Sequence, residues 1–282
     1  MVFTLVGCTE KNESSDQPEE QGEKQWSAVF ITSTPRGNEF TDLIWSGFGQ
    51  LEQDGWKVDC IETFETAEIA EQIRASVENG YDIIYTNGDD IKGVCMDLMS
   101  EIRETHPDTW FIYLDTYEET TDPNTCAVTI DPFEACFIAG YIAACESETH
   151  EVGVMLPLAD GIILRFEAGY YAGLDYADSL KGTTTTHHSA MTNDWVDTTK
   201  GYEAAKTLVG TYPNIDIMIQ CAYISGYGTI TACDEMQLRC IGVDNWQGYL
   251  SPYVFWSAVK SMDLAVVGSA TRIKNGEDIG RA

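Results

Sequence analysis

The chain has 282 residues, 44% of them hydrophobic, which is enough to bury the cores of two lobes of ordinary size. Its 16 basic and 46 acidic residues give a formal net charge of −30. Such a field repels nucleic-acid phosphates and anionic lipid headgroups, so the composition argues against both as partners.

The N-terminal residues MVFTLVGC (1–8) end in a Leu-Val-Gly-Cys segment that resembles the lipobox of bacterial lipoproteins, where cleavage precedes a cysteine that receives lipid. A positively charged start and a long apolar segment are both missing, so we interpret residues 1–8 as a truncated signal with Cys8 as the lipidation site. A chance Gly-Cys pair is the alternative. Residues 9–25 are acidic and free of apolar side chains, which predicts a flexible tether.

From Trp26 onward, short β-branched runs alternate with amphipathic stretches, the pattern of βαβ units around a parallel sheet. In the first half of the chain this pattern predicts strands over 28–32, 58–61, 82–86, 110–114 and 127–130, and helices over 40–53, 67–79 and 93–105. Asp131-Pro132 is typical of a helix start, with the aspartate as N-cap and the proline at the first helical position. We expect the helix that follows to cover 133–145.

A second series of the same kind predicts strands over 152–156, 183–187, 215–220, 240–243 and 254–259, helices over 163–180, 197–212 and 263–275, and a Gly-rich turn at 226–228 followed by a helix to Met236. The two series predict an α/β fold with two Rossmann-like lobes, each with a parallel sheet, joined by a hinge. We expect lobe I to cover 26–131, completed by 246–282, and lobe II to cover 132–245.

Catalytic motifs are missing from the sequence. It has no GxSxG, P-loop, HExxH or GxGxxG pattern, so we expect neither an enzyme nor a cofactor. His187 and His188 are neighbours on a predicted strand and point to opposite faces, which argues against a metal site. Eight cysteines follow Cys8, most of them within apolar runs and none at metal-knuckle spacing, so we expect buried thiols.

Asp244 ends the predicted strand of CIGVDNWQG (240–248). Parallel sheets bind ligands at the carboxyl edge, so Asp244 is a candidate ligand-binding residue, with a turn or helix cap as the alternative. Asn87 follows the strand over 82–86 in the same way. Aromatic residues also fall at this edge, and together they indicate stacking platforms worth about 1–3 kcal/mol each. They are Phe40, Phe166, Trp195, Tyr223, Trp246 and Tyr249.

Six segments occur in the order and spacing of one known lineage: DPFEACFIAGYIAAC (131–145), VGVMLPLADGIILRFEAGYYAG (152–173), NDWVDTTKGYEAA (193–205), AYISGYGTITA (222–232), IGVDNWQ (241–247) and SAVK (257–260). With them the chain resembles the basic membrane protein family, the purine-nucleoside-receptor-like lipoproteins that serve ABC transporters. The resemblance covers about 26 to 275. It implies a type I periplasmic-binding fold with a nucleoside in the cleft between the lobes.

The resemblance also implies roles for single residues. Phe40 and Phe166 match family phenylalanines that would hold a base between them. Asp244 matches the aspartate of the family's GVD segment, which is suited to accept hydrogen bonds from both ribose hydroxyls. Lys260 matches the lysine that closes the site near that aspartate. Gly226 would let the backbone approach the ligand.

The first loop departs from the family pattern. The family has Asp-x-Ser-Phe-Asn where this chain has Gly-Asn-Glu-Phe-Thr (37–41), so Thr41 stands in place of the ligand-contacting asparagine. Leu156-Pro157-Leu158 replaces a Gly-Gly pair. Capture of the sugar is therefore expected to be retained, while the identity of the base stays open. The strands that usually complete the second lobe are expected beyond Ala282.

These observations lead to one main hypothesis. The chain is expected to be a monomeric, extracytoplasmic lipoprotein of a bacterial ABC importer, lipid-anchored to the membrane, that binds a nucleoside, with a purine type favoured, and delivers it to a permease. Hinge closure would enclose the ligand. Two alternatives are a receptor for a sugar or another small solute on the same fold, and a cytosolic ligand-sensing regulator.

Overall fold

The computed structural model describes residues 24–116, 120–159, 161–277 and 279. Cys8 and residues 9–23 lie outside the described residues, so the lipid anchor and the tether stay predictions. Lys24 is the first described residue, and its ammonium group lies 2.6 Å from a carboxylate oxygen of Asp82. Within the ranges that the structure describes, no helix is both long and apolar enough to cross a membrane.

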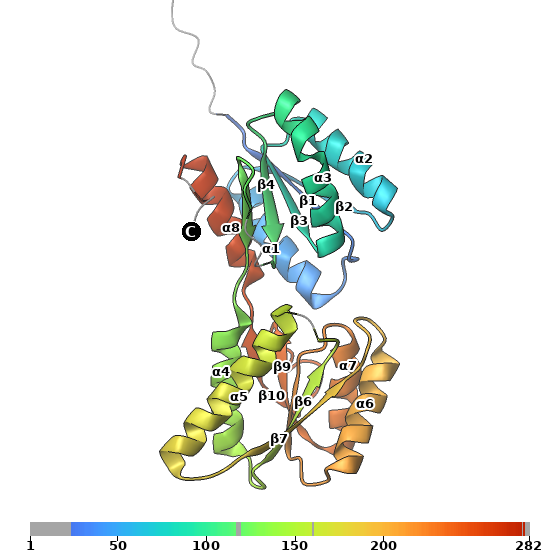
Figure 1. The fold of residues 1–282 in the computed structure, drawn as a ribbon, viewed down its shortest axis with the longest axis vertical. Helices are drawn as coiled ribbons and strands as arrows, with labels where there is room; N and C mark the ends of the chain where they lie inside the picture. The colour runs from blue at the N-terminus through green and yellow to red at the C-terminus, as the bar shows by residue number, and fades with distance from the viewer. Residues whose placement is uncertain (1–23, 117–119, 160, 278, 280–282) are drawn as a thin grey trace, which may run out of the picture.

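The upper lobe in Figure 1, lobe I, is built on a five-stranded parallel sheet of order β2-β1-β3-β4-β5. Its elements are β1 (Ser27–Thr32), α1 (Glu39–Gln53), β2 (Lys57–Glu62), α2 (Thr66–Glu78), β3 (Ile83–Asn87), α3 (Asp89–Thr105), β4 (Trp110–Leu114) and β5 (Thr125–Val128). Asn38 caps α1 because its side-chain oxygen accepts a hydrogen bond from the Thr41 amide at 2.9 Å.

The lower lobe, lobe II, repeats this topology with a parallel sheet of order β7-β6-β8-β9-β10. Its elements are α4 (Pro132–Glu146), β6 (Glu151–Leu156), α5 (Gly161–Lys181), β7 (Thr186–Met191), α6 (Thr198–Thr211), β8 (Ile217–Gln220), α7 (Ser225–Met236), β9 (Arg239–Asp244) and β10 (Val254–Val259). Asp131 caps α4 with Pro132 at its start, as predicted. The two-lobe α/β fold with parallel sheets is confirmed.

Helices cover both faces of each sheet, so each lobe has two apolar cores. In lobe I, α1 and α8 (Met262–Lys274) pack on one face, and α2 and α3 on the other. In lobe II, α4 and α5 cover one face, and α6 and α7 the other. Each fully buried Ile or Phe in these cores contributes about 1.5–3 kcal/mol by leaving water.

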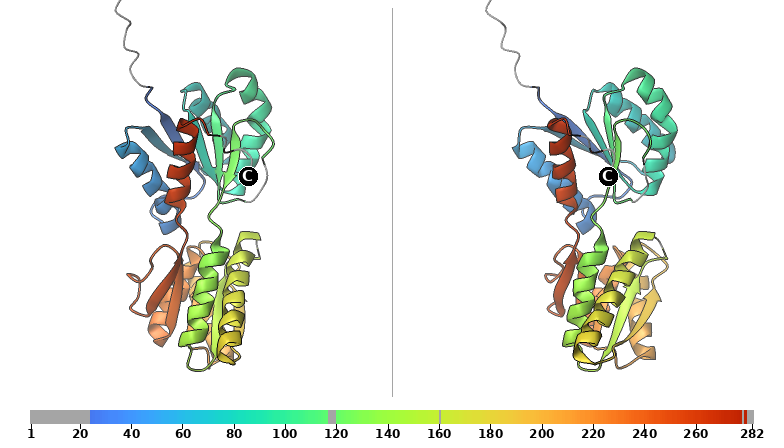
Figure 2. Two further views of the ribbon diagram at one scale, coloured as in Figure 1. Left: turned by 90° about the vertical axis from the view of Figure 1, so that its left-hand side faces the viewer. Right: turned by 60° about the vertical axis from the view of Figure 1, so that its left-hand side comes forward.

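The chain crosses between the lobes at residues 129–131 and again at 260–261 (Figure 2). The second crossover lies later than predicted. Residues 254–259 form β10, which pairs with β9 and extends the sheet of lobe II, so residues 246–259 do not complete lobe I. α8 returns to lobe I and packs against α1, and Ile279 beyond it is buried in the same core.

Two local predictions were wrong for identifiable reasons. The strand predicted over 183–187 begins at Thr186, because Thr183 and Thr185 instead donate hydrogen bonds to Asp178 and close the turn after α5. The Gly-rich turn predicted at 226–228 lies inside α7. A Cβ atom on Gly228 would lie 1.8 Å from the Thr198 carbonyl oxygen, so this glycine allows close packing of α6 against α7.

The same device joins α4 to α5, and it yields a stability prediction. A Cβ atom on Gly140 would lie 1.9 Å from the Tyr170 carbonyl oxygen. We therefore expect Gly140→Ala to lower the free energy of unfolding by about 1–3 kcal/mol through overpacking. Gly210→Ala is the matched control in α6, where nothing lies within 4 Å, and it should stabilise by about 0.5–1 kcal/mol. Urea unfolding measures both, and equal stability of the two variants would contradict this packing role.

Candidate ligand-binding site

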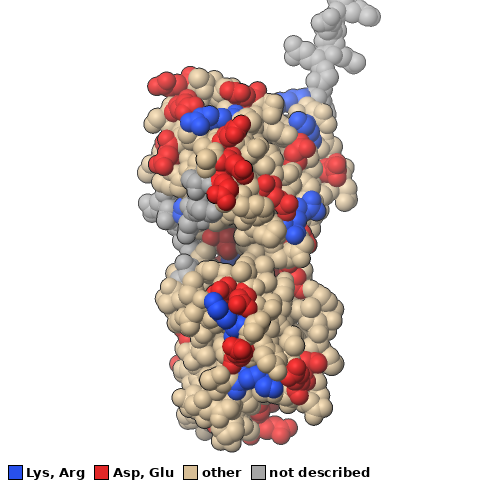
Figure 3. Space-filling model, turned by 90° about the vertical axis from the view of Figure 1, so that its right-hand side faces the viewer, with Lys and Arg blue, Asp and Glu red and all other residues tan. Residues whose placement is uncertain are grey.

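A cavity of about 440 Å³ lies between the lobes, within the range of about 300–1,000 Å³ typical of small-molecule sites. Figure 3 shows the molecule narrowing between the lobes, with acidic and basic atoms deep in the hollow. Residues from both lobes line the cavity: Ser33, Thr34, Phe40, Asn87, Gly88 and Asp115 from lobe I, Ile162, Ile163, Phe166, Trp195, Val196, Cys221, Tyr223 and Asp244 from lobe II, and Lys260 from the second crossover.

Asp244 is the last residue of β9, and its side chain borders the cavity. Its φ of 64° is a left-handed value that few residues other than glycine adopt, and Asp and Asn tolerate it best. Burial raises the pKa of Asp244 to about 6, and the charge of Lys260 limits that rise. The carboxylates of Asp115 and Glu39 raise this pKa further. The ionised form of Asp244 is therefore unfavourable until a ligand donates hydrogen bonds to it.

Lys260 is the cation of the cavity, and it is only 2% exposed. Its ammonium group forms a short ion pair with Asp115, which directly follows β4. β4 and β9 occupy corresponding places in the two sheets, so Asp115 and Asp244 are counterparts, and Asp115 also has a positive φ, of 61°. Thr129 in the first crossover donates to the same Asp115 oxygen at 2.9 Å. One carboxylate therefore holds both crossovers.

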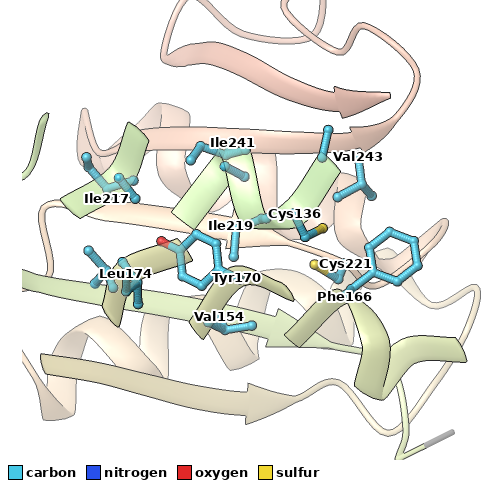
Figure 4. Packing of buried hydrophobic residues seen from close by; sticks show 14 of the residues in the cluster. Cys136, Val154, Phe166, Tyr170, Leu174, Ile217, Ile219, Cys221, Ile241 and Val243 are labelled. Carbon is cyan, nitrogen blue, oxygen red and sulfur yellow. The ribbon is translucent and has the colours of Figure 1, made fainter. Parts of the chain in front are cut away.

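Two phenylalanine rings, one from each lobe, flank this lysine. The ammonium group of Lys260 lies 5.9 Å from the ring centroid of Phe40 and 5.6 Å from that of Phe166. Figure 4 shows Phe166 at the edge of the lobe II core, beside Cys221. The ring of Tyr223 packs against that of Phe40 across the cleft in a T-shaped geometry, with 6.1 Å between the ring centroids. The ring centroid of Trp195 lies 6.4 Å from that of Tyr223. The cavity therefore combines aromatic walls with a charged floor.

Asn87 and Thr34 form a polar wall on lobe I. Asn87 is 5% exposed, and its side-chain oxygen has no hydrogen-bond partner in the described part of the chain. Its amide group donates weakly to Thr34 at 3.4 Å. Thr41 was predicted to contact the ligand, but it is fully buried and does not line the cavity. Its hydroxyl instead hydrogen-bonds the Thr34 hydroxyl at 2.9 Å and so positions a residue that does.

Three further candidates are not brought to the cavity: Gly226, Trp246 and Tyr249, the last of which is 66% exposed. Gly226 faces the side chain of Gln220, and a Cβ atom there would lie 1.7 Å from the amide oxygen, so its backbone cannot approach a ligand. Trp246 is 52% exposed and covers Gly248 on the outside of the loop after β9. Its place two residues after Asp244 made it a candidate, but its side chain does not line the cavity.

The structure adds residues that sequence reasoning missed, chiefly Asp115. The signal was present, because Asp115 follows the fourth strand of lobe I as Asp244 ends the fourth of lobe II. No group of three or more His, Cys, Asp or Glu among the described residues is arranged to hold a metal ion. His187 stacks on Tyr171, and His188 stacks on Tyr212 and bonds Glu151 at 2.8 Å.

Two parallel α/β lobes joined by paired crossovers, with a small-molecule cavity between them, define a type I periplasmic solute-binding protein. Solved structures share this fold. An ABC transporter solute-binding protein from Aeropyrum pernix matches with a TM-score of 0.75 at 20% identity, covering 89% of this chain and 71% of that one. A periplasmic solute-binding protein from Actinobacillus succinogenes with bound D-allose matches with a TM-score of 0.70 at 12% identity, covering 90% and 93%.

The family model described as ABC transporter substrate-binding protein PnrA-like, Bmp, matches residues 24–281, so the chain belongs to this family. This confirms the resemblance seen in the sequence. A CD4+ T-cell-stimulating antigen from Listeria innocua is 22% identical over 97% of this chain and 80% of its own length. The ABC transporter nucleoside-binding protein BmpA from Lactococcus lactis is 21% identical over 98% and 82%. Members of the family bind substrates for ABC transporters outside the cytoplasm and are not enzymes.

Proposed function

We propose that this substrate-binding protein captures a nucleoside and releases it to an ABC importer. The observation that carries the proposal is the pairing, in one cavity, of two phenylalanine rings from opposite lobes with the charged floor of Asp244, Lys260 and Asp115. A nucleoside has the same two-part chemistry, a flat apolar ring and a polar sugar. A purine, with its larger ring, is favoured.

The polar groups divide between the two parts of the ligand. Asp244 faces the cavity, and no side chain of the described residues hydrogen-bonds its carboxylate, so both oxygens are free to accept from a vicinal diol. The ammonium group of Lys260, which lines the same cavity, would donate to the sugar as well. The unpaired oxygen of Asn87 is suited to accept from an N–H or O–H of the ligand, because a buried acceptor without a partner costs about 1–3 kcal/mol. Phe40 and Phe166 would hold the ring.

Calorimetric titrations test the proposal with purine nucleosides, pyrimidine nucleosides, free bases, pentoses and hexoses. Nucleosides should bind, and the free base and free pentose should each bind far more weakly, because each satisfies only one half of the site. Binding of pentoses or hexoses without any response to nucleosides would overturn the proposal. It would favour the second candidate, a sugar receptor, which the cluster of two carboxylates and a lysine also suits.

We further propose that Cys8 carries the lipid anchor, that residues 9–25 tether the lobes to the membrane, and that the protein acts as a monomer beside its permease. Metabolic labelling with radioactive palmitate should label the full-length protein and fail with Cys8→Ser. A soluble, unlabelled cellular protein would favour the cytosolic regulator instead. Gel filtration of the folded part should give one chain per particle.

Binding should depend on pH through Asp244. Its pKa is about 6, and the ionised carboxylate is the form that accepts both sugar hydroxyls. The affinity of the free protein should therefore fall as the pH drops through 6 and be about ten-fold weaker at pH 5 than at pH 7. Calorimetry at both values measures this, with circular dichroism as the check that the fold is unchanged. A flat profile from pH 5 to 7 would show that this carboxylate does not grip the ligand.

A further inference from the structure

Two buried glutamines in lobe II form a relay that points toward lobe I. Gln220 at the end of β8 is fully buried, and Gln247 in the loop after β9 is 3% exposed. The backbone amide of Ala222 donates to the Gln220 side-chain oxygen at 3.1 Å, and the Gln220 amide donates to the Gln247 oxygen at 2.6 Å. Both hydrogen bonds of this relay run in the same direction, from Ala222 to Gln220 and from Gln220 to Gln247. The side-chain amide group of Gln247 is therefore left to donate to an acceptor outside the relay.

Glu39 of lobe I supplies that acceptor across the cleft. The Gln247 amide donates to a carboxylate oxygen of Glu39 at 2.6 Å. Beside it, the Tyr223 hydroxyl donates to the Asn38 side chain at 3.0 Å, and the Glu39 backbone amide donates to the Tyr227 hydroxyl at 3.3 Å. The N-terminus of α1 thus meets lobe II through three hydrogen bonds, and Glu39 itself does not line the cavity.

Glycines leave the space that this relay fills. A Cβ atom on Gly226 would lie 1.7 Å from the Gln220 oxygen, and one on Gly242 would lie 2.6 Å from the Gln247 oxygen. Gln247 is also fixed from behind, since its backbone amide donates to the Ser257 hydroxyl at 3.1 Å. The relay is therefore rigid within lobe II, and only its last hydrogen bond crosses between the lobes.

We propose that Glu39 is a closure clasp, a positioning residue that holds the lobes together through Gln247 whatever ligand lies in the cavity. The first loop therefore adds a contact between the lobes at Glu39, while Phe40 lines the cavity and Thr41 is buried.

Two features of the Glu39 carboxylate weaken the contact between the lobes. The second carboxylate oxygen of Glu39 is buried, with no hydrogen-bond partner among the residues described here, and opening the cleft would hydrate it. Burial raises the pKa of Glu39, and the hydrogen bond that its carboxylate accepts from Gln247 counteracts that rise. The closed form thus gains one strong charged hydrogen bond and loses the hydration of one oxygen, and these two effects oppose each other when the cleft opens.

The proposal is tested by exchanging the donor and the acceptor between residues 39 and 247. Small-angle X-ray scattering of the ligand-free protein then measures how far the lobes have opened. In Gln247→Glu, two carboxylates face each other, and the ratio of open to closed molecules should rise at least about ten-fold, with a larger radius of gyration. The double variant Glu39→Gln, Gln247→Glu restores a donor opposite an acceptor, because residue 247 still accepts from Gln220. It should return to the compact wild-type profile.

Two controls accompany the exchange. Glu52→Ala removes an exposed carboxylate from the same helix and should leave the scattering profile unchanged. Thermal melts by circular dichroism confirm that each variant is folded. A Gln247→Glu variant as compact as the wild type, or a double variant no more compact than Gln247→Glu alone, would overturn the clasp. Because no ligand is added, these outcomes are separate from success or failure of nucleoside binding.

Discussion

Replacing Asp244 by asparagine should weaken ligand binding at neutral pH by at least about 100-fold while both lobes stay folded, because the ligand's hydroxyls lose a charged acceptor and meet an amide donor. Asparagine is chosen over alanine since it tolerates the left-handed backbone at this position, where φ is 64°. Backbone strain then does not confound the loss. Calorimetric titration with the tightest-binding nucleoside measures the effect.

The same substitution should stabilise the ligand-free protein. The folded-state pKa of Asp244 is raised to about 6, so the stability contributed by its protonated form is full below about pH 4 and is lost as the pH rises through 6. Above pH 6 the wild type therefore carries an ionised group that folding disfavours. Asp244→Asn should be more stable by about 1–2 kcal/mol at pH 7.5 and no more stable at pH 4, allowing for solvent in the cavity.

Urea unfolding at the two pH values measures the change in stability, and the calorimetric titration measures the change in affinity. Asp175→Asn on the exposed face of α5 is the matched control and should change neither quantity. Wild-type affinity in Asp244→Asn would show that the aspartate serves only to end β9 and turn the chain. Lost affinity together with lost stability at pH 7.5 would place its role in folding.

The architecture could be predicted because it rests on local patterns. Alternating β-branched runs and amphipathic stretches located every described strand and helix of the two lobes, and Asp131-Pro132 marked the start of α4. The errors arose where a residue type serves two purposes. Threonine favours strands, but Thr183 and Thr185 cap a turn. Glycine favours turns, but Gly228 allows two helices to touch.

The site could be predicted only in part, because several of its contacts join residues that lie far apart in the sequence and in different parts of the fold. Asp244 was found from the end of its own strand, and Phe40 and Phe166 from their helix starts. The partner of Lys260 was missed, since Asp115 lies 145 positions away in the sequence and in an acidic stretch that resembles solvated surface. Glu39 was set aside as a departure, yet its partner Gln247 lies in the other lobe. No local spacing encodes such pairs.

Replacing Lys260 by methionine should abolish binding and also destabilise the protein, unlike the change at Asp244. Methionine keeps an unbranched apolar chain between Phe40 and Phe166, so packing is largely retained. The charge is lost, and Asp115 and Asp244 then face one cavity without a cation. Removing one partner of a buried ion pair costs about 3–5 kcal/mol, and the two carboxylates would also repel the lobes from each other.

The companion variant Lys260→Met, Asp115→Asn separates these effects. The asparagine removes the unpaired charge, still accepts from Thr129 and tolerates the positive φ at this position, so stability should recover while binding does not. Lys206→Met, which breaks an exposed ion pair with Glu235, is the control and should leave unfolding unchanged. If Lys260→Met binds ligand normally, or if the double variant is no more stable than the single one, Lys260 does not join the crossovers to the ligand through Asp115. The expected pattern would make one buried charge responsible both for the hinge and for the grip on the sugar.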